Sequence, residues 1–332
     1  MTRKLVLMEN PMSPVAMARD ILPPEFEMLV ARPGSPAFAE AMREAEFLVG
    51  FATAQLDAEF YAAAPRLRLL QLLSAGYDRC DIAAARDAGV PICTNGGANG
   101  NAVAEHTLML MLAVGRHLLW QHRTVVAGGW RGQSNSQPSL IELRGRTLGI
   151  VGLGNIGRKV ARLARAFGMA VIYFDQHRLS EAEEDALEVR FRLLPEVLAA
   201  SDVVTLHVPL TPATRHMIGA AELARMQPHA ILLNTSRGPV VDEAALHGAL
   251  RDGGIAGAGL DVFDQEPPPQ DNPLFGLDNV VLTPHLAGPT GDNVLARFRN
   301  GFDNCQRVAR GQAPFWVIPE LEGMRRRTPG PA

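Results

Sequence analysis

Three chargeable residues stand just after apolar segments in the second half of the chain: Arg237, Glu266 and His285. A histidine exchanges protons near neutral pH, and a carboxylate bonded to its ring fixes the tautomer. An arginine holds a carboxylate through two parallel hydrogen bonds and can polarise a carbonyl group. We therefore expect His285 to be an acid/base, Glu266 its partner and Arg237 an anion clamp. Such a set suits the oxidation of an alcohol beside a carboxylate, or the reverse reduction.

Each of these residues also has a structural interpretation. Arg237 could cap a strand edge, and Glu266 precedes a proline-rich loop. Most histidines in a protein are structural, but His285 follows an apolar segment and stands between a proline and a glycine, which favours a functional role. We interpret His207, at another strand end, as part of a cofactor wall rather than as the catalyst.

A glycine-rich turn reads Gly152-Leu153-Gly154-Asn155-Ile156-Gly157. This spacing alone is weak, but here it follows an apolar segment and opens a helical pattern. Gly152 permits a tight turn, Gly154 lets the backbone approach a pyrophosphate, and Gly157 lets helix and strand pack closely. The free N–H groups of the helix start would bind the phosphates. The turn therefore predicts a dinucleotide site.

The next apolar segment ends in Asp175, about twenty residues beyond the first glycine, as in dinucleotide-binding units. Its carboxylate would accept hydrogen bonds from the adenosine ribose and repel a 2′-phosphate. NAD is therefore favoured over NADP, although the nearby Arg178 could soften that preference. We expect no metal site.

Apolar segments alternate with helical patterns in two stretches of the chain, which predicts two parallel sheets covered by helices. The strands expected in the first stretch are residues 5–8, 28–31, 47–50, 69–73 and 90–93. The strands expected in the second stretch are residues 147–151, 170–174, 202–208, 231–235, 257–262 and 280–283. Six strands are the usual number in a dinucleotide-binding domain.

The expected domain order is discontinuous. Residues 1–98 and 289–332 would form a substrate domain, and residues 99–288 the NAD-binding domain. One long helix is expected from about residue 101 to 126, followed by an irregular arm to about 140. A final amphipathic helix, from after Pro289 to about residue 310, would return to the first domain.

Charge and length exclude several classes of function. The chain has 332 residues and a formal net charge of −3, which does not favour nucleic acid. The cluster Arg325-Arg326-Arg327 is interpreted as a solvated end. No apolar segment approaches the roughly 20 residues that span a bilayer, so we expect no membrane insertion. Lys4 and Lys159 are the only lysines, and neither has the context of Schiff-base or GK[ST] phosphate chemistry.

The three cysteines, Cys80, Cys93 and Cys305, are scattered and form no CxxC pair. This spacing indicates neither a disulfide framework nor a zinc site, and fits a reducing compartment. A cytoplasmic location is therefore expected.

Motifs along nearly the whole chain resemble the D-isomer-specific 2-hydroxyacid dehydrogenase family. The resemblance rests on the segments described above and on Ser74-Ala75-Gly76-Tyr77-Asp78, Val103-Ala104-Glu105-His106-Thr107, Leu206-His207-Val208-Pro209-Leu210-Thr211 and Arg237-Gly238-Pro239-Val240-Val241-Asp242-Glu243. It implies two Rossmann-like or flavodoxin-like doubly wound α/β domains, with the nucleotide domain inserted into a discontinuous substrate domain. It also implies a homodimer built around the long helix and the arm after it.

The resemblance assigns Arg237, Glu266 and His285 to catalysis. The cofactor positions that it implies, with the glycine-rich turn, are Val103, Asn155, Ile156, Asp175, His207, Val208, Pro209, Thr235, Ser236, Asp261 and Gly288. Backbone N–H groups of Ala75-Gly76-Tyr77 would bind the substrate carboxylate together with Arg237. Pro289 departs from the small residue usual in the family after Gly288.

The expected activity is NAD(H)-dependent interconversion of a small D-2-hydroxy acid and its 2-keto acid, of glyoxylate, hydroxypyruvate or pyruvate size. Residues 74–78 hold no lysine or arginine for a substrate phosphate, and Arg79 lies just outside. Two alternatives stay open: a dehydrogenase of phosphoglycerate or another oxyanion, and a non-enzymatic NAD(H)-sensing corepressor. The Arg–Glu–His set disfavours a methyltransferase.

Overall fold

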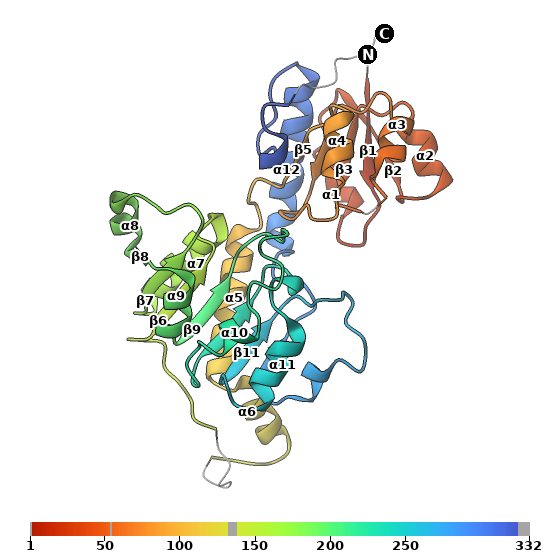
Figure 1. The fold of residues 1–332 in the computed structure, drawn as a ribbon. Helices are drawn as coiled ribbons and strands as arrows, with labels where there is room; N and C mark the ends of the chain where they lie inside the picture. Colours follow the sequence, from red (N-terminus) through yellow and green to blue (C-terminus); the bar gives the residue numbers. More distant parts are fainter. Residues whose placement is uncertain (1, 54, 132–137, 325–332) are drawn as a thin grey trace. The chain divides into compact units, whose positions relative to one another are not determined.

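The computed structural model describes residues 2–53, 55–131 and 138–324. The chain divides into two compact units, Met1–Asn99 with Pro289–Ala332 and Gly100–Gly288, which are described separately (Figure 1). The arginine cluster at residues 325–327 and part of the expected arm lie outside the described residues.

The first unit is built on five parallel strands in the order β2-β1-β3-β4-β5. Its strands are β1 (Arg3–Met8), β2 (Phe26–Ala31), β3 (Phe47–Gly50), β4 (Leu69–Leu72) and β5 (Ile92–Cys93). Its helices are α1 (Val15–Asp20), α2 (Pro36–Met42), α3 (Ala58–Ala63), α4 (Ile82–Asp87) and α12 (Gly291–Ala309). Side-chain caps at Ser35, Asp57 and Asp81 begin three of these helices.

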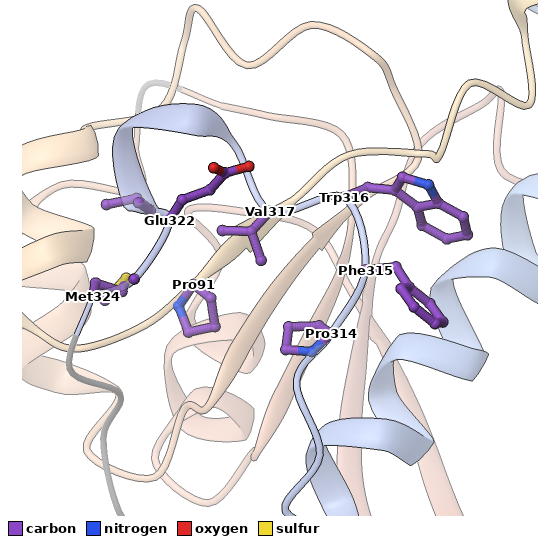
Figure 2. A pocket seen from close by; sticks show the side chains of 9 residues that line it. Pro91, Pro314, Phe315, Trp316, Val317, Glu322 and Met324 are labelled. Carbon is purple, nitrogen blue, oxygen red and sulfur yellow. The ribbon is translucent and has the colours of Figure 1, made fainter.

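Helix α12 buries an apolar face against this sheet. Phe298 and Phe302 stack with ring centroids 5.9 Å apart and share a core cluster with residues of β1, β3 and β4. A buried polar link fixes the register, since Asn304 Nδ2 donates to Gln71 Oε1 over 2.8 Å. Beyond α12, residues 314–317 and 321–324 line a pocket of about 320 Å³ with Pro91 (Figure 2).

The second unit holds seven parallel strands in the order β12-β11-β10-β9-β6-β7-β8. Its strands are β6 (Thr147–Val151), β7 (Ala170–Phe174), β8 (Val189–Phe191), β9 (Val203–Leu206), β10 (Ile231–Asn234), β11 (Gly257–Leu260) and β12 (Val280–Leu282). Its α-helices are α5 (Gly100–Gly115), α6 (Leu118–Val126), α7 (Asn155–Ala166), α8 (Glu181–Leu187), α9 (Leu194–Ala200), α10 (Ala220–Leu223) and α11 (Glu243–Arg251). The order reverses at β6, where the ligand site of such sheets lies.

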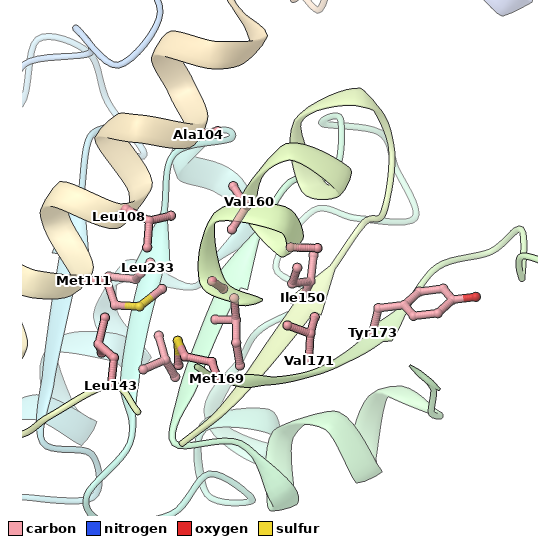
Figure 3. Packing of buried hydrophobic residues seen from close by; sticks show 14 of the residues in the cluster. Ala104, Leu108, Met111, Leu143, Ile150, Val160, Met169, Val171, Tyr173 and Leu233 are labelled. Atoms are coloured by element: carbon pink, nitrogen blue, oxygen red, sulfur yellow. The ribbon is translucent and has the colours of Figure 1, made fainter. Parts of the chain in front are cut away.

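The main core of this unit lies between the sheet and helices α5 and α7 (Figure 3). Leu108 and Met111 of α5 and Val160 of α7 share this core with Leu233 of β10 and Ile150 of β6. The helical spacing of these apolar residues matches one buried face on each helix.

Two sequence expectations need correction. The long helix expected over residues 101–126 is interrupted, because His117 adopts a left-handed conformation with φ of +48° between α5 and α6. Its N–H bonds to Val114 O at 3.0 Å, one residue short of the α-helical partner. The second sheet has a seventh strand, β8, which pairs with β7 at the sheet edge. With three residues, β8 is too short to show an apolar period.

No helix in the described part of the chain combines the length and apolar character needed to cross a membrane. Within the same residues, no cluster of histidine, cysteine or carboxylate side chains is placed to hold a metal ion.

Candidate active site

His285 stands on a loop that the buried Asp261 holds in place. Asp261 accepts hydrogen bonds from the N–H groups of Leu286 at 2.9 Å and Ala287 at 2.8 Å, and from Thr283 Oγ1 at 2.6 Å. The backbone N–H of His285 bonds to Asp261 O at 2.8 Å. His285 has a φ of +55°, a left-handed conformation that is costly for a residue with a side chain. The bonds to Asp261 hold the loop in this conformation.

Glu266 bonds directly to the His285 ring. Its Oε2 lies 2.7 Å from His285 Nδ1, and its Oε1 accepts the N–H of Phe263 at 3.2 Å. Burial raises the pKa of Glu266, but the hydrogen bond from His285 and the nearby positive charges outweigh it, so the pKa lies below the ordinary value. The ionised carboxylate keeps the proton on Nδ1 and leaves Nε2 to exchange a proton with a ligand.

Arg237 follows β10 in a tight loop. Its Nη1 donates to Ser236 O at 2.7 Å, and Asn234 Nδ2 donates to Arg237 O at 2.9 Å. The guanidinium is close enough to Glu266 to help lower that residue's pKa. The structure therefore gathers Arg237, Glu266 and His285 at the carboxyl edge of one sheet.

A glycine joins the Arg237 loop to the Glu266 loop. A Cβ atom on Gly238 would lie 1.8 Å from Phe263 O, so no side chain fits there. The backbones of the two loops are thus in direct contact, three residues before Glu266.

Two further groups brace these loops, and sequence reasoning gave neither a role. Glu243, at the start of α11, accepts Asp264 N–H at 3.1 Å and Asn272 Nδ2 at 2.7 Å. His106 of α5 lies 2.9 Å from Thr283 Oγ1 through its Nε2. Both residues occur in the motifs quoted above, but only three-dimensional contacts show what they hold.

The glycine-rich turn lies between β6 and α7. Gly152 has a φ of +95°, and a Cβ atom there would lie 2.7 Å from His207 O. A Cβ on Gly157 would lie 2.2 Å from Gly152 O, whereas one on Gly154 would meet no described atom within 4 Å. Helix α7 begins beside this open space with no side-chain cap. Open backbone and free helical N–H groups fit a pyrophosphate.

The carboxylate of Asp175 lies against this turn. Its Oδ2 accepts Leu153 N–H at 2.7 Å, and its Oδ1 accepts His177 N–H at 2.9 Å. Asp175 therefore stands at the end of β7 next to the turn, where the ribose of a dinucleotide would lie.

The other expected cofactor residues all belong to the second unit. Val103 of α5 is buried, and Thr235 bonds to Thr107 with 3.1 Å between hydroxyl oxygens. The side chain of Ile156 packs into the core, which leaves its backbone for a ligand. The remaining positions lie near the start of α7 or at strand ends: Asn155, His207, Val208, Pro209, Ser236, Asp261 and Gly288.

His207 differs from His285. Its Nε2 lies 3.0 Å from Thr205 Oγ1, while its Nδ1 is buried without a partner among the described residues. Burial lowers the pKa of His207 to about 3, so the ring is neutral at physiological pH.

The expected substrate loop, Ala75-Gly76-Tyr77, follows β4 in the first unit. Ser74 Oγ donates to Gly76 O at 2.9 Å, and burial raises the pKa of Tyr77 to about 12. At the ends of the neighbouring strands β1 and β3, a pocket of about 520 Å³ is lined by Met8, Glu9, Asn10, Pro33, Phe51, Ala52, Thr53, Gln55 and Arg79.

Comparisons with known proteins agree on one family. The sequence model described as "D-isomer specific 2-hydroxyacid dehydrogenase, NAD binding domain" matches residues 108–287. A glyoxylate reductase of Korarchaeum cryptofilum is 40% identical over 301 residues, 90% of each chain. A glyoxylate reductase of Thermococcus litoralis is 43% identical over 281 residues, 83% of this chain and 84% of that protein.

Among solved structures, the NADPH-dependent glyoxylate/hydroxypyruvate reductase of Sinorhizobium meliloti, in complex with NADP and malonate, has a TM-score of 0.84 and 28% identity, covering 99% of this chain and all of that one. The two-sheet architecture expected from the sequence is confirmed. The chain belongs to the D-isomer-specific 2-hydroxyacid dehydrogenase family, oxidoreductases that interconvert 2-hydroxy and 2-keto acids with a nicotinamide cofactor.

Proposed function

We propose that this protein reduces glyoxylate, hydroxypyruvate or a 2-keto acid of similar size with NADH, and forms the D-2-hydroxy acid where the product is chiral. The observation that carries the proposal is the 2.7 Å bond between His285 and Glu266, formed beside Arg237 in the same sheet as the glycine-rich turn. The glyoxylate reductases similar to this chain support the choice of substrates.

Proton transfer is assigned to His285. A nicotinamide held at the glycine-rich turn would supply the hydride for reduction, or accept it in the reverse direction. His285 Nε2 delivers the proton to the oxygen that becomes the hydroxyl group, and Glu266 stabilises the ring in its charged form before that step. After transfer, the Nδ1–H remains bonded to Glu266, so the ring is ready to be protonated again.

Substrate-binding residues are proposed for each unit by itself. Arg237 holds the carboxylate and polarises the keto oxygen, and a fixed guanidinium in this place stabilises the developing negative charge. The backbone N–H groups of Ala75-Gly76-Tyr77 are assigned to carboxylate binding in the first unit, which is proposed as the substrate domain, and the second unit is proposed as the NAD domain. The 520 Å³ pocket at the neighbouring strand ends offers room for a small side chain.

NAD is the proposed cofactor, held at the positions that the sequence indicates. The supporting observation is Asp175, whose carboxylate lies against the glycine-rich turn and would repel a 2′-phosphate. The NADPH-dependent reductase among the structural neighbours shows that related proteins can use the other cofactor. The preference for NAD is therefore proposed for this chain alone and not for its relatives.

A homodimer is proposed from α6. None of its residues is buried in the single chain, and Leu118, Leu119, Val125 and Val126 are all exposed. An apolar helix face of this kind needs a partner surface, here a second copy of the chain. A cytoplasmic location is also proposed, supported by the scattered spacing of Cys80, Cys93 and Cys305, which form no CxxC pair.

A substrate panel tests the activity. We expect NADH oxidation with glyoxylate and hydroxypyruvate, much less with 3-phosphohydroxypyruvate, and D-glycerate as the product from hydroxypyruvate by chiral chromatography. Oxidation of NADH only with the phosphorylated acid would replace the proposed substrate class, and L-glycerate would contradict the assigned stereochemistry. Sedimentation of the full chain tests the dimer, with a monomer at micromolar concentration as the contrary result.

A further inference from the structure

Two arginines lie close to Asp175, one through a shared backbone contact and one in the chain. Arg158, in the first turn of α7, donates from Nε to Leu153 O at 3.3 Å, while the N–H of the same Leu153 donates to Asp175 at 2.7 Å. Arg178 lies three residues after Asp175. Arginine is the usual partner of a 2′-phosphate in cofactor sites, so both side chains stand where they could oppose the selectivity of Asp175.

Consecutive glutamates of α8 hold these two arginines. Glu183 Oε1 lies 3.7 Å from Arg158 Nη1, and Glu184 Oε1 lies 3.1 Å from Arg178 Nε. One short helix thus provides a carboxylate to each of the two guanidinium groups.

The Glu184 contact is anchored inside the unit. Glu184 is 4% exposed, and its Oε1 also accepts the hydroxyl of Tyr173 at 3.0 Å. Tyr173 in turn accepts Leu179 N–H at 2.9 Å, which fixes the chain just after Arg178. The Arg178 guanidinium also lies over the Phe191 ring, 5.3 Å from its centroid. Moving Arg178 toward a ligand would leave a buried carboxylate without its cation, which is costly.

The Glu183 contact is longer and more exposed. Glu183 is oriented by the capping box of α8, since its Oε2 accepts the N–H of Ser180 at 3.1 Å and the hydroxyl at 2.9 Å. Its pair with Arg158 is therefore the weaker of the two restraints.

We propose that Glu183 and Glu184 are positioning residues for cofactor selectivity, which keep Arg158 and Arg178 from binding the 2′-phosphate of NADP. The inference rests on the proposed use of NAD and adds a second set of residues to Asp175. It goes beyond a simple stabilising role for α8, because it predicts a change in ligand preference.

The test uses the full-length double variant Glu183→Gln/Glu184→Gln. Glutamine keeps the size of the side chain and suits the capping box, but removes the charge. Isothermal titration with 2′,5′-ADP and with 5′-ADP measures the two ribose forms without turnover. We expect affinity for 2′,5′-ADP to rise on the order of tenfold, as charge-assisted bonds to the released arginines form, while affinity for 5′-ADP stays unchanged.

Two control variants make the result specific. Glu181→Gln removes a charge from the same turn of α8, where no ion pair with either arginine is found among the described residues, and should change neither affinity. Adding Arg178→Met to the double variant should remove most of the gain. If the double variant does not fold, the exposed Glu183→Gln alone should still show a gain of about threefold through Arg158.

Unchanged 2′,5′-ADP affinity in the folded double variant would overturn the inference, and so would an equal gain in Glu181→Gln. The proposed function is judged separately, by NADH turnover of the unmodified protein with glyoxylate. If the unmodified protein reduces glyoxylate but the double variant gains no affinity for 2′,5′-ADP, only the inference is contradicted. If the double variant gains affinity but the unmodified protein does not reduce glyoxylate, only the proposed function is contradicted.

Discussion

Two histidines follow strands of the same sheet, His207 after β9 and His285 after β12, and their surroundings are opposite. His285 bonds to a carboxylate at 2.7 Å and is about half exposed. The His207 ring bonds only to a threonine hydroxyl among the described residues, and burial lowers its pKa to about 3. Position at a strand end therefore does not make a histidine an acid/base. A charged partner and access to solvent distinguish His285.

The largest effect should come from His285→Gln, which removes the proton donor and keeps a side chain that can bond to Glu266. We expect kcat for glyoxylate reduction to fall by about 10²–10⁴-fold, the usual contribution of acid–base catalysis. NADH binding, followed by fluorescence, should stay within about twofold because none of the cofactor positions is altered. Retained turnover would mean that another group donates the proton and that His285 does not differ from His207 in its catalytic role.

Glu266→Gln should have the next largest effect. The amide has no charge to stabilise the protonated ring and can present either an oxygen or an N–H group to Nδ1. We expect kcat to fall on the order of 10²-fold, with partial recovery in Glu266→Asp. An unaltered kcat in the glutamine variant would show that the 2.7 Å bond does not serve catalysis.

Glu243→Gln should have a moderate effect. The residue touches neither His285 nor Glu266 in the described structure but holds the chain on both sides of Glu266 through Asp264 and Asn272. We expect kcat/KM to fall on the order of tenfold, by analogy with lost supporting bonds at metal sites. Asn272→Ala should give a similar loss. The double variant Glu243→Gln/Asn272→Ala should lose little more, because both substitutions act on the same contact between Glu243 and Asn272. Additive losses would mean that the two residues act separately.

His207→Gln should change turnover least, by no more than about threefold in steady-state kinetics, because a ring with a pKa of about 3 carries no proton to donate near neutral pH. Its signature should appear in stability. Between an unfolded pKa of 6.5 and a folded pKa of about 3, the unfolded chain binds more protons, so the free energy of unfolding falls as pH drops through this window. Urea unfolding at pH 5 and 6 should show this slope, about 1.4 kcal/mol per pH unit, reduced in the variant. Equal slopes would mean that His207 is protonated in the folded state.

The sequence was informative where a local pattern carries the information. Ligand sites in parallel sheets lie at the carboxyl ends of the strands, so a residue that follows a predicted strand can be placed from the sequence. This holds for the turn from Gly152 to Gly157, for Asp175 and for the loops of Arg237, Glu266 and His285. The same reasoning separates His285 from His207, although the pKa of His207 depends on the packing around its ring.

Contacts between distant side chains could not be predicted. The sequence places Arg178 beside Asp175 but does not show that Glu184 and Phe191 restrain it. The break at His117 was missed because neighbouring apolar residues continue the helical period on both sides. The role of Glu243 depends on which backbone N–H groups another loop brings near its carboxylate. The spacing of residues along the sequence does not show which groups these are.

The absence of a side chain at Gly238 has a consequence for how this enzyme can vary. Because a Cβ atom there would lie 1.8 Å from the Phe263 carbonyl oxygen, the segment that carries Arg237 and the segment that carries Glu266 are packed too closely to move independently. A methyl group at position 238 would push the two segments apart and displace Arg237 and Glu266 together. Substitutions that admit a bulkier acid must then occur at other positions, where a change in side-chain size leaves the proposed proton transfer intact.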